Sequence, residues 1–206
     1  IPLIAMGSTS IQFNLSSKIK NIRVKNINNS FNKSTIKKED NSAIEKPKDI
    51  ASSKNLETFK LLDKSSGNVL TVSIKDLTCG AVASELSPNF ETETLKAQAV
   101  AAFTYFNFER QKQKENPSES LKGADFAVNT QSWQYYVTKQ QMQDRWKDKF
   151  EEYYNKLSSA VDTVLNQILI FEDQPILALY HSTSSGKTEA IKDVFGGDLP
   201  YLQTVD

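Results

Sequence analysis

The segment from about Glu91 to Lys114 constrains the fold more than any other part of the chain. It contains the run Leu95-Lys-Ala-Gln-Ala-Val-Ala-Ala102, in which strong helix formers predominate, and Asn116-Pro117 follows its end. Acidic residues in its first turn favour a helix start there. We therefore predict a long helix with one buried stripe, formed by Leu95, Ala99, Ala102, Phe103 and Phe106.

A second long helix is predicted over about residues 139–165. Thr138 and Gln141 have the spacing of a capping box at its start. The segment between the two helices, residues 117–137, has no regular apolar period and is predicted to be irregular. Apolar residues recur through the second helix at Met142, Trp146, Phe150, Tyr153, Tyr154, Leu157, Val161 and Val164.

Two pairs of β-prone runs flank these helices. Thr58–Leu62 and Val69–Ile74 surround a Gly-containing turn, which is typical of a hairpin. Gln167–Phe171 and Ile176–Tyr180 surround the short turn at 172–175 and predict a second hairpin. The expected fold class is therefore α+β, with two β-hairpins or a small antiparallel sheet packed against two long helices.

The N-terminal quarter has a different composition. Residues 8–53 are rich in Ser, Asn, Lys and Ile without a sustained apolar period, which predicts a flexible linker in which only Ile11–Leu15 favours a short strand. Residues 1–7 are mildly apolar, so they are either a frayed terminus or the outer end of a membrane anchor. The folded domain is expected to span residues 54–206.

Composition excludes several classes of protein. The chain has 206 residues, with 25 basic and 25 acidic side chains, and this zero net charge argues against a general nucleic-acid binder. One cysteine, Cys79, and one histidine, His181, exclude an internal disulfide and make a metal site unexpected. The sequence Ser185-Gly186-Lys187-Thr188 is not a phosphate-binding loop, because His181 stands where such a loop needs glycine.

Glu85 is the leading candidate for chemistry. It comes shortly before the first predicted helix, with Leu86 and Pro88 beside it. If these two residues limit its access to water, the pKa of its carboxyl rises and the group can donate a proton near neutral pH. The alternative is a solvated acidic residue before a helix, which composition alone favours.

A second motif, near the end of the chain, supports a functional role for Glu85. Leu177–Glu189 reads LALYHSTSSGKTE, and DVFGG and LPYL follow it. Together with the Glu85 segment and the LKAQAVAA helix, it resembles the stage II sporulation protein D family (SpoIID/LytB). The three motifs occur in the family's order and cover roughly residues 70–206.

The resemblance implies a lytic transglycosylase acting on peptidoglycan glycan strands, with Glu85 as the catalytic residue. One carboxylate suffices for this reaction, because the sugar's own C6 hydroxyl is the nucleophile. No metal or other cofactor is expected. The substrate-binding residues are expected to lie across a cleft from Glu85, at Tyr180, His181, Ser182, Thr183, Ser184 and Lys187.

The resemblance also implies a setting for the protein. It favours an N-terminal membrane anchor and an extracytoplasmic location at the sporulation septum or engulfing membrane. The expected partners are glycan strands, with or without peptide stems, a SpoIIP-like cell-wall amidase and a membrane scaffold protein.

The chain departs from the family pattern at several points. Ser84-Glu85-Leu86-Ser87 replaces the usual Gly-Glu-Met-Pro, Phe103 replaces an arginine, and Ser185 replaces a glycine. The cysteine and histidine element that some members use for zinc has no counterpart around residues 129–136. These departures leave a second hypothesis open, in which the chain is a catalytically degenerate member that binds glycan or a partner protein without cutting.

Overall fold

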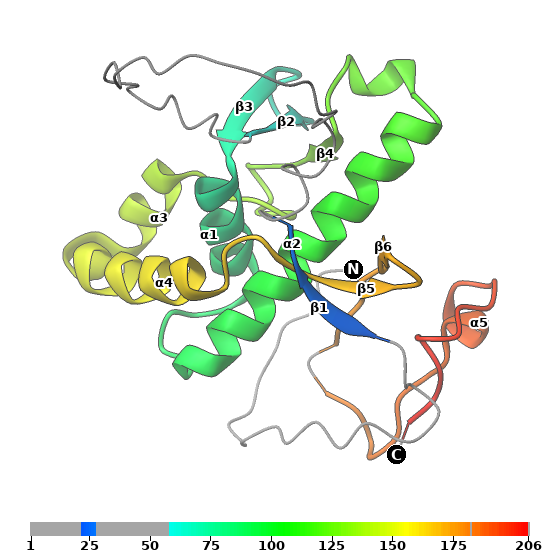
Figure 1. The fold of residues 1–206 in the computed structure, drawn as a ribbon. Helices are drawn as coiled ribbons and strands as arrows, with labels where there is room; N and C mark the ends of the chain where they lie inside the picture. The colour runs from blue at the N-terminus through cyan, green and yellow to red at the C-terminus, as the bar shows by residue number, and fades with distance from the viewer. Residues whose placement is uncertain (1–21, 28–57, 182, 206) are drawn as a thin grey trace, which may run out of the picture.

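The computed structural model describes residues 22–27, 58–181 and 183–205. It confirms the α+β class. Two three-stranded sheets, with strand orders β3-β2-β4 and β1-β5-β6, lie on different sides of the long central helix α2 (Thr92–Glu115), as Figure 1 shows. The bounds of α2 agree with the helix predicted between Glu91 and Lys114.

The first sheet contains the first predicted hairpin. Strands β2 (Thr58–Asp63) and β3 (Val69–Ser73) pair antiparallel, and Gly67 in their turn has a φ of 73°. A short strand that was not predicted, β4 (Phe126–Val128), pairs parallel to β2. The sheet is therefore mixed rather than purely antiparallel, because β4 arrives through α2 instead of a tight turn.

The second predicted hairpin is only partly confirmed. Strands β5 (Gln167–Phe171) and β6 (Gln174–Pro175) pair antiparallel around Glu172 and Asp173, which both have positive φ, as a two-residue type I′ turn requires. The predicted strand over 176–180 is wrong, because β6 ends at Pro175. After one more ladder bond, from Ile176 N to Leu169 O, the backbone leaves the sheet.

Strand β1 (Arg23–Asn26) completes this sheet by pairing antiparallel with β5. It lies inside the segment predicted to be a linker, and it was not predicted. The rest of that segment, including the predicted strand at 11–15, and the candidate anchor at 1–7 lie outside the described residues.

Helix α1 (Ile74–Glu85) was not predicted at all. Its N-cap is Ser73, whose Oγ accepts a hydrogen bond from Asp76 N at 3.1 Å. Gly80 lets the helix lie close to the loop that follows β4, since a Cβ at this position would be 2.4 Å from Val137 O. Glu85 precedes α2, as predicted, but it is also the last residue of the unpredicted helix α1.

The second predicted helix is broken in two. Helix α3 (Lys139–Trp146) begins with the predicted capping box, and α4 (Phe150–Val164) follows after the short 3₁₀ turn η3 (Lys147–Lys149). Lys147 has a φ of 50°, which ends α3. Because the apolar spacing continues across the break, the sequence pattern does not reveal it.

The remaining elements are short. They are the 3₁₀ turn η2 (Glu119–Leu121) and helix α5 (Ile191–Val194). The segment around α5 lies beside the β1-β5-β6 sheet, on the opposite side of the molecule from α3 and α4 (Figure 1). Within the described residues, no helix combines the length and the apolar character that crossing a bilayer requires.

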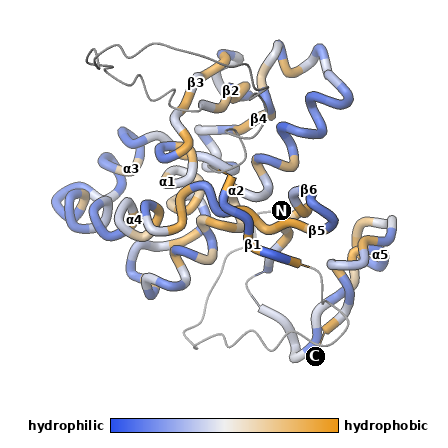
Figure 2. Tube along the Cα trace, viewed as in Figure 1, coloured by the Kyte–Doolittle hydropathy of each residue, from blue (hydrophilic) through white to orange (hydrophobic). Residues whose placement is uncertain are grey.

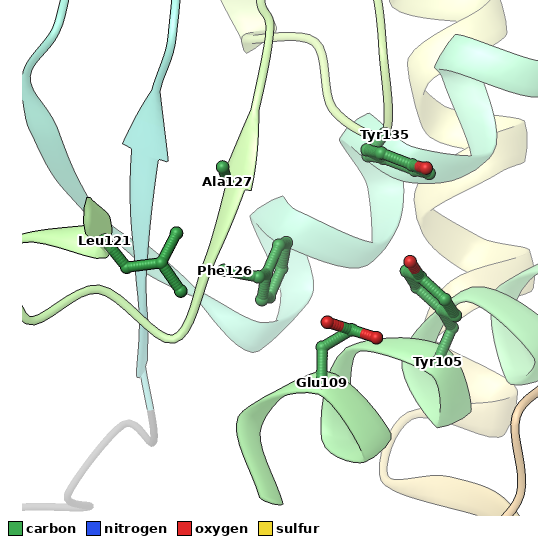
Figure 3. Close-up of a pocket in the computed structure, with 6 residues that line it drawn as sticks. All are labelled: Tyr105, Glu109, Leu121, Phe126, Ala127 and Tyr135. Atoms are coloured by element: carbon green, nitrogen blue, oxygen red, sulfur yellow. The ribbon is translucent and has the colours of Figure 1, made fainter. Parts of the chain in front are cut away.

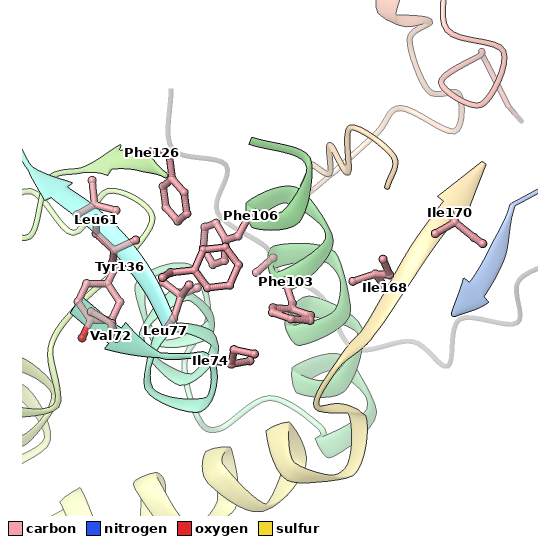
Figure 4. Packing of buried hydrophobic residues seen from close by; sticks show 14 residues of the cluster. Leu61, Val72, Ile74, Leu77, Phe103, Phe106, Phe126, Tyr136, Ile168 and Ile170 are labelled. Carbon is pink, nitrogen blue, oxygen red and sulfur yellow. The ribbon is translucent and has the colours of Figure 1, made fainter. Parts of the chain in front are cut away.

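Two hydrophobic clusters hold the elements together. The first joins both sheets to α2, with Phe103 between residues of the β2–β3 hairpin and Ile168 of β5 (Figure 4). The second joins α1, α2, α3 and α4 through residues such as Val82, Leu95 and Val161. Figure 2 shows that the last turns of α2 are hydrophilic, so the residues of α2 that pack in the hydrophobic clusters lie in its earlier turns.

Candidate functional site

Glu85 is held at the end of α1 by the packing on both sides of it. Leu86 N donates to Val82 O at 2.8 Å, which closes the last turn of the helix. Leu86 and Pro88, which are expected to limit the access of water to Glu85, are themselves buried. The connection to α2 is anchored where Lys156 Nζ of α4 donates to Phe90 O at 2.7 Å.

The environment of Glu85 favours its protonated form. The side chain is half-buried, and this burial raises the pKa of its carboxyl. A hydrogen bond from the Tyr180 hydroxyl partly offsets the rise, because it stabilises the carboxylate. The negative end of the α1 dipole lies beside the group and also disfavours a negative charge. Glu85 therefore holds its proton more strongly than a solvated glutamate does, which is the property that a general acid requires.

Tyr180 is the residue that faces Glu85 from the other end of the sequence. Burial raises the pKa of its hydroxyl, and the neighbouring charge of Glu85 raises it further. Tyr180 consequently stays a neutral phenol that can donate to the carboxylate. Of the residues predicted to line the site, it is the one that the structure brings to Glu85.

Gln98 on α2 is a functional candidate that the sequence analysis missed. Its side chain is only 8% exposed, and its interaction with Tyr180 lowers the pKa of the tyrosine. Among the described residues, however, Gln98 Nε2 has no partner at hydrogen-bond geometry. A buried donor of this kind is costly unless something else binds it. The signal in the sequence was a glutamine on the apolar stripe, three residues after Leu95.

The other predicted binding residues lie in an exposed segment. His181, Thr183, Ser184 and Lys187 all face solvent, and the described hydrogen bonds of the first three stay within the segment. His181 Nδ1, for example, is 3.1 Å from Thr183 O. Ser182 lies outside the described residues. The expectation that this segment faces Glu85 across a cleft therefore stays a prediction for every residue except Tyr180.

Two positions singled out in the sequence are core positions. Phe103, which stands where the resembled family has arginine, is 2% exposed and packs edge-on against Phe59, with ring centroids 6.2 Å apart. Cys79 is fully buried in α1, and this burial raises the pKa of its thiol to about 12. A thiol in this environment does not fit a zinc ligand, which must be a thiolate. No cluster of three or more His, Cys, Asp or Glu side chains suited to a metal occurs in the described part of the chain.

Comparison with known proteins agrees with the sequence motifs. The profile of the family described as stage II sporulation protein (SpoIID) matches residues 63–171, a span that includes Glu85 and α2 but ends before Tyr180. Stage II sporulation protein D of Bacillus subtilis (strain 168) is 33% identical over 138 residues, which are 67% of this chain and 39% of that protein.

Two further relatives are similar to this chain over about the same number of residues. Stage II sporulation protein D of Bacillus amyloliquefaciens is 33% identical over 141 residues, 68% of this chain and 40% of that protein. An uncharacterized protein of Brachyspira hyodysenteriae (strain ATCC 49526 / WA1) is 31% identical over 135 residues, 64% of this chain and 31% of that protein. The matched part of the chain thus spans two fifths or less of the length of each relative.

Proposed function

The chain belongs to the stage II sporulation protein D family, and we propose that it is a lytic transglycosylase that cleaves peptidoglycan glycan strands in sporulation. The observation that supports this proposal most directly is the environment of Glu85. It is a half-buried carboxyl at a helix end, its pKa is raised by burial, and a tyrosine hydroxyl is directed at it. These are the properties of a general acid.

The proposed reaction needs no second carboxylate. Glu85, protonated, donates its proton to the glycosidic oxygen while the bond from the sugar C1 to that oxygen breaks. The C6 hydroxyl of the same sugar then attacks C1, and the Glu85 carboxylate takes the hydroxyl proton. One strand end becomes a 1,6-anhydro sugar, the other gains a free hydroxyl, and Glu85 regains its proton. No water is consumed, unlike in hydrolysis by a pair of carboxylates.

Tyr180 and Gln98 support the two charge states that Glu85 passes through. The Tyr180 hydroxyl stabilises the carboxylate after proton donation, while burial keeps the acid form accessible beforehand. Gln98 Nε2 lies near Tyr180 without reaching full hydrogen-bond geometry, so it can donate to a substrate oxygen beside Tyr180. Gln98 is positioned by helix α2, whereas Tyr180 lies in the irregular segment that follows β6.

The experiment compares Glu85→Gln with Glu91→Gln on glycan strands stripped of peptides. Glu91 is a matched control, because it is an exposed glutamate six residues further on. Glu85→Gln should lower kcat by at least about 100-fold with little change in strand binding, since the amide cannot donate the proton. Glu91→Gln should keep wild-type turnover. If Glu85→Gln cuts as fast as wild type, Glu85 is not the acid; if wild type binds strands but never cuts them, the chain is a binding member of the family.

The setting of this activity is proposed on the same family membership. We expect the protein to act outside the cytoplasmic membrane at the sporulation septum, together with a SpoIIP-like amidase that removes peptide stems and a membrane scaffold protein. Peptide-free strands are then the natural substrate, because the amidase would supply them.

A further inference from the structure

A small pocket with an aromatic wall lies between α2, β4 and the loop that follows β4. It has a volume of about 230 Å³ and is lined by Tyr105, Glu109, Leu121, Phe126, Ala127 and Tyr135. Figure 3 shows the Glu109 carboxylate directed toward the space between Phe126 and Tyr105, with Tyr135 on the other side. We call this site the tyrosine pocket.

The tyrosine pocket is built on two stacked rings. Tyr105 and Tyr135 have ring centroids 5.8 Å apart and planes inclined by 23°. Tyr105 is half-buried on α2, whereas 38% of Tyr135 remains exposed. Tyr105 thus supports one face of the Tyr135 ring, and the exposed part of Tyr135 is available to a ligand.

The loop that carries Tyr135 holds it in a costly conformation. Tyr135 has a φ of 67°, and Trp133 has a φ of 58°, values that bulky residues rarely adopt. The loop is pinned at Thr130, whose backbone N–H donates to Asp63 Oδ1 at 3.1 Å and whose carbonyl accepts from Gln141 Nε2 at 2.8 Å. Two hydrogen bonds between Asn129 and Gln134 close it.

The tyrosine pocket adjoins the Glu85 site. Burial raises the pKa of Tyr105, and the charges of Tyr135, Glu109 and Tyr180 raise it further. The pKa of Tyr180 is in turn affected by Glu85 and by Tyr135. Tyr180 is therefore close both to Glu85 and to the stacked pair of Tyr105 and Tyr135, although these residues are far apart in sequence.

We propose that the tyrosine pocket is a subsite for one N-acetylhexosamine unit of the glycan strand, next to the units between which Glu85 cuts. This inference rests on the proposed function. The apolar face of the sugar ring packs on Tyr135, and the acetamido methyl contacts Leu121, Phe126 and Ala127. The acetamido N–H donates to the Glu109 carboxylate.

The composition of the pocket favours an acetylated sugar over a free amino sugar. The Glu109 carboxylate is the only charged group among the residues that line the pocket, and Lys112 Nζ lies 4.0 Å from it. The other lining residues are Leu121, Phe126, Ala127 and the two tyrosines. A methyl group gains from contact with such walls, whereas an ammonium group would be desolvated by them. The small volume suits one sugar unit.

The test measures strand binding in the Glu85→Gln background, so that cutting does not interfere. The probes are peptide-free glycan strands and the same strands after chemical removal of their acetyl groups. Tyr135→Ala removes the open ring, and Ala127→Met fills the pocket from β4. Tyr135→Phe is the matched control, because it keeps the ring. Thermal melting of each variant verifies folding.

Tyr135→Ala and Ala127→Met should each weaken binding of acetylated strands about tenfold, and Tyr135→Phe should change it less than about twofold. De-N-acetylated strands should bind weakly to the parent protein, with little further loss from Ala127→Met, because the filled pocket and the missing acetyl group remove the same contact.

Two results would overturn the subsite alone, namely strand binding that is insensitive to both variants, or tighter binding of the de-N-acetylated strands. If the Glu85→Gln protein binds neither kind of strand, the proposed function falls together with the subsite. The two failures are thus distinguished by whether the parent protein binds acetylated strands at all.

Discussion

At the scale of single residues, Tyr180 adjusts how strongly Glu85 holds its proton. Burial raises the pKa of Glu85, and the Tyr180 hydroxyl opposes that rise by donating to the carboxylate. The acid form is required for the first step, so activity should fall as the pH increases through the raised pKa. The alkaline limit of activity therefore reports on this pair.

Replacing Tyr180 with phenylalanine should move that limit in a defined direction. Tyr180→Phe removes the donor that stabilises the carboxylate, so the pKa of Glu85 rises further and the acid form persists to higher pH. The alkaline limb of kcat/KM against pH should shift upward, while the maximal rate falls because the carboxylate intermediate loses its donor. A limb that stays in place, or that shifts downward, would show that Tyr180 does not contact Glu85 in the working enzyme.

The residues of the site differ in how far sequence could identify them. Glu85 and Tyr180 lie in long motifs, and the resemblance of those motifs to the stage II sporulation protein D family singled them out. Gln98, Tyr105 and Tyr135 become neighbours of Tyr180 only after α2 and the loop following β4 have packed. No local pattern encodes that proximity, and an aromatic residue in a loop is as compatible with a core as with a ligand site.

At the scale of elements, α1 was unpredictable because its stability comes from packing. Its sequence contains Gly80 and the β-branched Thr78 and Val82, which are poor helix formers. All three are buried, so the helix is specified by its neighbours rather than by an amphipathic period. The Ser73 to Asp76 spacing was the one local signal. By contrast, α2 was predicted because helix formers and an apolar stripe coincide there.

Gly80 gives the packing of α1 a direct test. In an exposed helix, alanine is more stable than glycine by about 1 kcal/mol. At position 80 a Cβ would lie 2.4 Å from Val137 O and 2.5 Å from the Tyr136 ring. Gly80→Ala should therefore destabilise the protein by about 1–3 kcal/mol in urea unfolding. A gain in stability would mean that α1 does not lie against this loop.

At the scale of the whole molecule, the fold should not depend on a bound metal. The Cys79 thiol is buried with its pKa raised to about 12, and the described residues contain no cluster of metal-binding side chains. Melting temperatures measured with and without a strong chelator should agree. A decrease of many degrees with the chelator would indicate a structural metal and contradict this prediction.

The central claim is that Glu85 directs a transfer within the sugar rather than a hydrolysis. Peptide-free glycan strands should be digested in water enriched in oxygen-18, and the new ends analysed by mass spectrometry. We predict 1,6-anhydro ends that contain no oxygen-18, formed by wild type and absent with Glu85→Gln. New reducing ends in place of 1,6-anhydro ends would show that water is the nucleophile, and they would contradict the single-carboxylate mechanism.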